Sequence, residues 1–175
     1  MQNESALRQH IVDLLTKENA HAGFEAAIKG LPASLRGRRP KGAEHSAWEI
    51  LEHMRIAQHD ILDFSVNPKY KELAWPADYW PKTKAPATAA AWNRSVQAFR
   101  KDLKAMCALV AAESTDLFAK IPHGDGQTIL REALLIADHN ATTLANWCCC
   151  GVCWVHGTGV ELVRIPQTAP ISVCR

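Results

Sequence analysis

Apolar residues recur with the spacing of amphipathic helices through the first 141 residues of the chain. Residues 4–18 place several leucines and an isoleucine on one helical face, and residues 20–30 continue this pattern. Residues 32–44 are rich in glycine, proline and arginine, a composition that is typical of a loop. The pattern therefore predicts helical segments up to residue 30, followed by an irregular connection.

A long second helix is predicted from Ser46 to the residue before Asn67. Ser46 is a preferred N-cap residue, and Glu49 three positions later completes the sequence signature of a capping box. The helix should end before Asn67-Pro68, because the residue before a proline disfavours helical geometry. Residues 67–88 hold four prolines and four large aromatic residues, which indicates an ordered excursion rather than a linker.

Two further helices complete the predicted fold. Residues 88–114 carry an apolar stripe at helical spacing, and a fourth helix should begin after Thr128, which can cap it. No strand-like alternation of useful length precedes residue 150. Four long amphipathic helices with one long crossover predict an all-α protein, a four-helix bundle followed by an irregular C-terminal tail.

Size and composition fit a single soluble domain. The chain has 175 residues, of which 47% are hydrophobic and 22% charged, and its net charge of +2 gives no reason to expect nucleic acid or an anionic membrane as partner. No apolar run approaches the ~20 residues that span a bilayer, and no signal peptide is recognisable, so a cytoplasmic location is expected. The oligomeric state, a homodimer included, stays open.

Two histidines are candidates for chemistry. His53 shares a face of the second helix with apolar residues, and His139 is placed similarly on the fourth, so both imidazoles should point inward. Neutral imidazole binds zinc and nickel well, but a catalytic site would need a third protein ligand and an open position for water. Two buried histidines with purely structural roles fit the same spacing, and spacing alone leaves both interpretations open.

The remaining histidines and one acidic residue complete the list of candidates. Glu49, one turn before His53, is a conceivable ligand or supporting partner, although its place in the capping box favours a capping role. The other histidines with clear positions fall on polar faces or in loops and are interpreted as surface residues: His10, His21, His45, His59 and His123.

Three phrases of the sequence carry a resemblance to a known family. "HSAWEILEHMRIAQHDILDFSVNPKY", "WPADYWP" and "HGDGQTILREALLIADHNA" resemble the DinB/YfiT-like superfamily of small four-helix metal-binding proteins. The resemblance is good over residues 32–141 and loose over the first helix. It implies a divalent metal bound by a histidine on the second helix and a His-x-x-x-His pair on the last.

The resemblance assigns metal ligation to His53 and His139, but the second histidine of the pair is replaced by Thr143. It implies a metal-dependent hydrolase or thiol-transferase acting on an unknown small molecule, with zinc or nickel weakly bound or absent and with impaired activity. A non-catalytic helical domain, which binds a small molecule or a partner or serves in stress without metal, is the alternative. No catalytic residue beyond the ligands can be named.

Residues 142–175 change character abruptly, with cysteines at 148, 149, 150, 153 and 174. When the last base of each codon is read with the first two of the next, the junctions from Asn146 to Cys150 must encode Leu-Val-Leu-Leu. The junctions ending at Thr142 and Thr143 permit Tyr-His, which would restore the missing histidine. We therefore hypothesise a bundle domain over residues 1–141 and a frameshift product over residues 142–175.

A competing interpretation makes the tail a zinc knuckle, with Cys148, Cys150, Cys153 and His156 as ligands. Thiolates suit zinc, but the second cysteine pair of a structural site is absent, and adjacent cysteines ligate one ion with difficulty.

Overall fold

The computed structural model describes residues 2–18 and 22–149 of the chain. All the regular elements of this part are helices, which confirms the predicted all-α class, and no strand forms within it. None of its helices is long and apolar enough to cross a membrane. Its α-helices are α1 (Gln2–Thr16), α2 (Phe24–Ile28), α3 (Ala47–Val66), α4 (Ala89–Ala111) and α5 (Ile129–Cys149), and its 3₁₀ turns are η1 (Ala33–Leu35) and η2 (Ala77–Tyr79).

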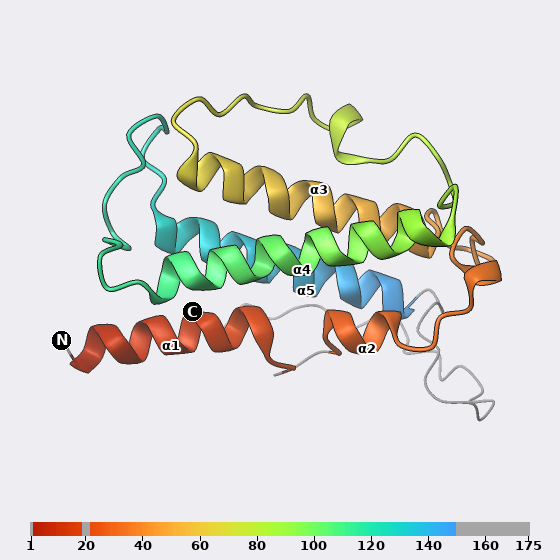
Figure 1. The fold of residues 1–175 in the computed structure, drawn as a ribbon, viewed down its shortest axis with the longest axis horizontal. Coiled ribbons are helices and arrows are strands. Elements are labelled where there is room, and N and C mark those ends of the chain that lie inside the picture. The colour runs from red at the N-terminus through yellow and green to blue at the C-terminus, as the bar shows by residue number, and fades with distance from the viewer. Residues whose placement is uncertain (1, 19–21, 150–175) are drawn as a thin grey trace, which may run out of the picture.

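The four long helices form a bundle. Figure 1 shows α3, α4 and α5 running alongside one another, with α1 and α2 following each other on the side away from α3. The helix α3 packs mainly against α4 and α5, and α1 packs against α4 and α5. The excursion 67–88, here called the aromatic strap, arches over α3 (Figure 1). It therefore covers the helix that carries His53.

The start of α3 is fixed by the predicted capping box. The Ser46 hydroxyl accepts the backbone N–H of Glu49 at 3.2 Å, and the Glu49 carboxylate accepts the backbone N–H of Ser46 at 2.8 Å. These bonds satisfy two N–H groups that have no partner inside the helix. The helix ends at Val66, before Asn67-Pro68, as the sequence predicts.

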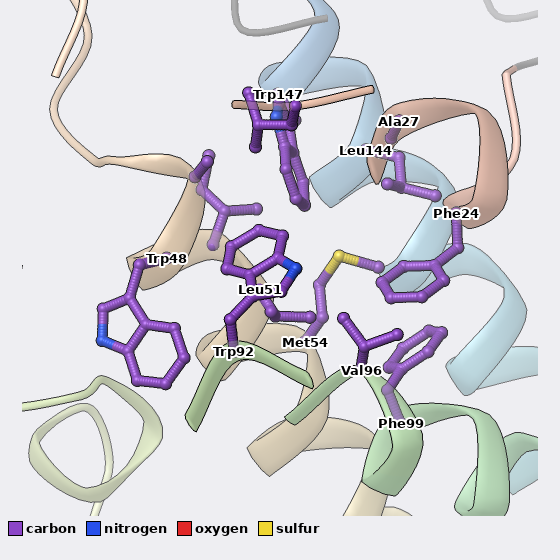
Figure 2. Close-up of a cluster of buried hydrophobic side chains, with 13 residues drawn as sticks. Phe24, Ala27, Trp48, Leu51, Met54, Trp92, Val96, Phe99, Leu144 and Trp147 are labelled. Atoms are coloured by element: carbon purple, nitrogen blue, oxygen red, sulfur yellow. The ribbon is translucent and has the colours of Figure 1, made fainter. Parts of the chain in front are cut away.

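A buried amide relay joins three helices in the core. Gln58, only 1% exposed, donates to the backbone carbonyl of Phe99 at 2.7 Å and accepts from the Asn140 amide at 3.0 Å. Apolar side chains form two clusters among the helices, and Figure 2 shows the one that includes Trp92 and Trp147. The relay therefore links α3, α4 and α5 through the two hydrogen bonds of the Gln58 amide.

The last helix is longer than the sequence analysis predicted. We expected the regular bundle to end near Ala141, but α5 continues to Cys149. Leu144 is 6% exposed and Trp147 is fully buried in the same cluster as Trp92. Burial of these two side chains offsets the modest helix propensity of the threonines and cysteines around them. The frameshift hypothesis stays a prediction, and residues 150–175 lie outside the described part of the chain.

Candidate metal centre

His53 and His139, selected from the sequence, lie against each other in the bundle. His53 projects from the middle of α3 and is 7% exposed, while His139 projects from α5 and is half-buried. Their Nε2 atoms are 3.1 Å apart. The inward orientation predicted for both imidazoles is therefore confirmed, and their role as metal ligands stays a prediction.

The backbone of the aromatic strap fixes the protonation pattern of His53. Its Nδ1 lies 2.9 Å from the carbonyl oxygen of Tyr79. Because a carbonyl can only accept, Nδ1 must carry the hydrogen, and in the neutral ring Nε2 then presents its lone pair. That lone pair faces His139. Histidines that bind metals are oriented by hydrogen bonds of this kind.

The spacing of the two Nε2 atoms fits a shared metal ion. Two nitrogens that bind one tetrahedral zinc ion, each at ~2.05 Å, are about 3.3 Å apart. The same spacing also fits a direct bond in which His139 Nε2–H donates to His53. In either arrangement His139 Nδ1 is buried and has no hydrogen-bond partner within residues 2–18 and 22–149.

Trp80 of the aromatic strap covers the ring of His53. The two rings are stacked, with centroids 4.1 Å apart and planes inclined by 4°. His45 stacks on the same indole, with centroids 3.9 Å apart. The sequence left open whether the aromatic residues of the strap cover a pocket or only add packing. The structure places one of them directly on the candidate ligand, where it excludes water from that ring.

Both histidines are disposed to be neutral. Burial lowers the pKa of His53; the Tyr79 carbonyl opposes this shift, and charge on His45 adds to it. Burial also lowers the pKa of His139, charge on His53 lowers it further, and the neighbouring Asn140 and Asp138 act in the opposite direction. The neutral form is the one that binds metals, so a lowered pKa keeps both lone pairs available at neutral pH.

Glu49 has a capping role and is engaged by other groups. Burial disfavours its charged form, but hydrogen bonds from Arg39 and Ser46 outweigh burial and hold the pKa of this carboxyl below its usual value. Arg39 binds the carboxylate through two guanidinium nitrogens. Glu49 is therefore held away from the ligand role that the sequence had left open.

A third protein ligand is missing from the described site. Thr143 lies one turn beyond His139 and is half-buried. Within residues 2–18 and 22–149, no group of three or more histidines, cysteines or acidic residues is placed to hold a metal ion. The site that the structure brings together is thus a pair of imidazoles.

Of the other histidines within residues 2–18 and 22–149, all but one lie where expected. His10, His59 and His123 are exposed, whereas His45 is half-buried against Trp80 and not simply a surface residue. His21, Cys150, Cys153 and His156 lie outside the described residues. Sequence reasoning missed the Tyr79 carbonyl, because a backbone acceptor carries no residue-type signal.

A separate cavity of about 520 Å³ lies between α1, α2, α4 and α5. Its walls are mainly apolar, and Phe24, Phe99 and Leu144 contribute to them, but neither His53 nor His139 does. The cavity falls in the size range of small-molecule sites, so the molecule offers a second place for a ligand away from the histidines.

Comparison with known proteins identifies one family. The model of the DinB superfamily matches residues 18–142, which is more than half of the chain. The match ends one residue after Ala141, where the change in sequence character begins. No curated protein and no solved structure matches the chain.

Proposed function

Because the chain belongs to the DinB superfamily, we propose that it is a divalent-metal-binding protein in which His53 and His139 supply two ligands. The observation that carries the proposal is the 3.1 Å approach of the two Nε2 atoms, with the Tyr79 carbonyl holding the hydrogen of His53 on Nδ1. Imidazole ligands favour zinc or nickel among the common divalent ions.

The proposed site lacks one ligand, which lowers its expected affinity for the metal ion. By the family pattern a third histidine is expected at position 143, where this chain has Thr143. A neutral hydroxyl is a poor substitute for an imidazole, so the ion is weakly bound and turnover is reduced or absent. A divalent ion bound there would lower the pKa of a bound water or thiol, the chemistry of a metal-dependent hydrolase or thiol-transferase.

Zinc titration of the chelator-treated protein tests this proposal. We expect one equivalent of zinc to bind, and we expect binding at this site to be lost in His53→Ala and in His139→Ala. The matched control is His59→Ala, which removes an exposed imidazole of α3 that is hydrogen-bonded to Asp102. All variants are made in a background with Cys148→Ser, Cys150→Ser and Cys153→Ser, which removes the three thiols of the competing zinc-knuckle interpretation.

A restored ligand provides a gain-of-function test. Thr143→His returns the third histidine of the family pattern on the same helix as His139. We expect zinc affinity to rise at least about 10-fold, since metal–ligand bonds are strong and the other two ligands are already in place. Zinc binding that is equal in the parent, His53→Ala and His139→Ala proteins would refute the proposal.

The 520 Å³ cavity favours a second candidate, a helical domain that binds a small apolar molecule without metal. Ala141 lines this cavity. If zinc does not bind the histidine pair, we expect an apolar fluorescent dye to bind the protein and Ala141→Trp to block it by filling the cavity. Equal dye binding by the parent and the variant would contradict this second candidate.

A further inference from the structure

Asp60 connects α3 to the aromatic strap. It lies seven residues after His53, so the two side chains share a face of α3 about 10.5 Å apart along its axis. One carboxylate oxygen accepts the Tyr70 hydroxyl at 2.9 Å, and the other accepts the Tyr79 hydroxyl at 2.6 Å. Hydrogen bonds to an ionised acceptor are shorter and stronger than neutral ones.

Tyr79 links this carboxylate to the histidine pair. Its hydroxyl donates to Asp60, and its backbone carbonyl accepts from Nδ1 of His53 at 2.9 Å. The next residue, Trp80, stacks on the His53 ring. One residue of the strap thus contacts both Asp60 and His53, and its neighbour covers the imidazole.

The C-terminal end of the strap is anchored separately from its middle. Near its C-terminal end, Thr83 accepts from the Trp48 indole at 3.1 Å, and the carbonyl of Lys84 accepts from the Ser46 hydroxyl at 2.6 Å. These bonds lie several residues from Tyr79. The position of the Tyr79 carbonyl therefore depends on contacts made nearer to it in the strap. Among them are the hydrogen bonds that the hydroxyl groups of Tyr70 and Tyr79 donate to Asp60.

We propose that Asp60 is a positioning residue for His53. It holds the strap in the one position in which the Tyr79 carbonyl keeps hydrogen on Nδ1, so that the Nε2 lone pair points to His139. Loss of the carboxylate leaves two half-buried hydroxyl groups without their acceptor and frees the middle of the strap. His53 then loses the bond that selects its tautomer.

The tautomer of His53 in the metal-free full-length chain is the primary readout. Nitrogen-15 NMR of histidine-labelled protein at pH 8 distinguishes the two neutral tautomers, and His53→Gln assigns the signal. We expect hydrogen on Nδ1 in the parent protein and an increased share on Nε2 in Asp60→Ala. The matched control is Asp63→Ala, because Asp63 lies one turn further on α3 and bonds the side chain of Asn67 rather than a strap tyrosine.

A second variant keeps the test decisive if Asp60→Ala fails to fold by circular dichroism. Tyr70→Phe combined with Tyr79→Phe removes the two hydroxyl groups and retains the rings, and it should change the tautomer in the same direction. An unchanged His53 tautomer in the folded Asp60→Ala protein, or in the double variant, would overturn the inference. So would an equal change in Asp63→Ala.

The effect on metal binding rests on the proposed function and is measured separately. We expect zinc affinity to fall about 10-fold in Asp60→Ala, the lower end of the range for residues that orient metal ligands. If His53→Ala leaves zinc binding intact, the proposed function fails while the tautomer result still decides the role of Asp60. If zinc binds through His53 but its tautomer does not respond to Asp60, only the positioning role fails.

Discussion

Trp147 offers the sharpest test of how far the bundle extends along α5. It is fully buried and belongs to the cluster shown in Figure 2, where its indole points toward Trp92. It also lies beyond Ala141, in the segment that sequence character alone separates from the bundle. Substitution of Trp147 therefore asks whether this segment stabilises the fold.

The expected cost follows from burial and from one unpaired group. A buried tryptophan removes ~200 Å² of surface from water, which at ~25 cal/mol per Å² is worth about 5 kcal/mol. Its indole N–H is buried without an acceptor among the described residues, which costs about 1–3 kcal/mol. Trp147→Ala should thus lower the free energy of unfolding by about 2–4 kcal/mol. Trp147→Phe, which removes the unpaired N–H and keeps an aromatic ring, should stay within about 1 kcal/mol of the parent.

Urea unfolding followed by circular dichroism measures both free energies, because this signal does not depend on the tryptophan that is removed. Leu134→Ala is the matched control, since Leu134 lies on the same helix with 43% of its surface exposed and should cost much less. A cost below about 0.5 kcal/mol for Trp147→Ala would refute the reasoning and return the end of the bundle to Ala141. Equal costs for the alanine and phenylalanine variants would refute the role of the unpaired N–H.

Other predictions concern the rest of the bundle. Arg8 is buried and donates to three backbone carbonyls at and after the end of α4. Arg8→Met should lower the free energy of unfolding by about 1–3 kcal/mol in the same urea assay, and an unchanged midpoint would contradict this. Gln58→Leu should cost about 1–3 kcal/mol, because it leaves the amide of Asn140 without its acceptor, and a neutral effect would show that the relay does not matter. Folding lowers the pKa of His53 and of His139 below the ordinary histidine value, so the unfolded chain binds more protons than the folded chain as the pH falls. The metal-free protein should therefore lose stability from pH 7.5 to 5.5. The double variant His53→Gln, His139→Gln should lose less stability over this range, and equal losses would contradict the assignment. Sequencing of the gene across codons 138–150 should reveal a neighbouring frame that continues the helix with histidine at 143. An intact frame, with no neighbouring-frame continuation in close relatives, would refute the frameshift hypothesis.

The candidate site shows what helical periodicity can and cannot predict. The inward orientation of His53 follows from its position among apolar residues of α3, and the same holds for His139 on α5. Periodicity gives the face of each residue on its own helix. It does not give the rotation and register of two helices packed together, so the 3.1 Å approach of the Nε2 atoms could not be derived from it.

The length of α5 shows that local helix propensity can also mislead. Threonines and cysteines are modest helix formers, so the segment after Ala141 argued against a continued helix. Leu144 and Trp147 are three residues apart, and the adjacent cluster accepts both side chains. Their burial is a property of that cluster, which is built from α2, α3 and α4 as well as α5. Local propensity carries no information about it.

The sequence by itself determined the helices up to Ala141, the capping box that starts α3 and the two inward histidines, because each depends on residues within a few turns of one another. The family followed from phrases spread over most of the chain. Only the tertiary structure decided that the strap lies over α3, that Asp60 receives two tyrosine hydroxyls and that the Tyr79 carbonyl sets the hydrogen of His53. These contacts join groups up to 26 residues apart through a loop without regular periodicity. Their geometry follows from packing and hydrogen bonding across the fold, which no local pattern specifies.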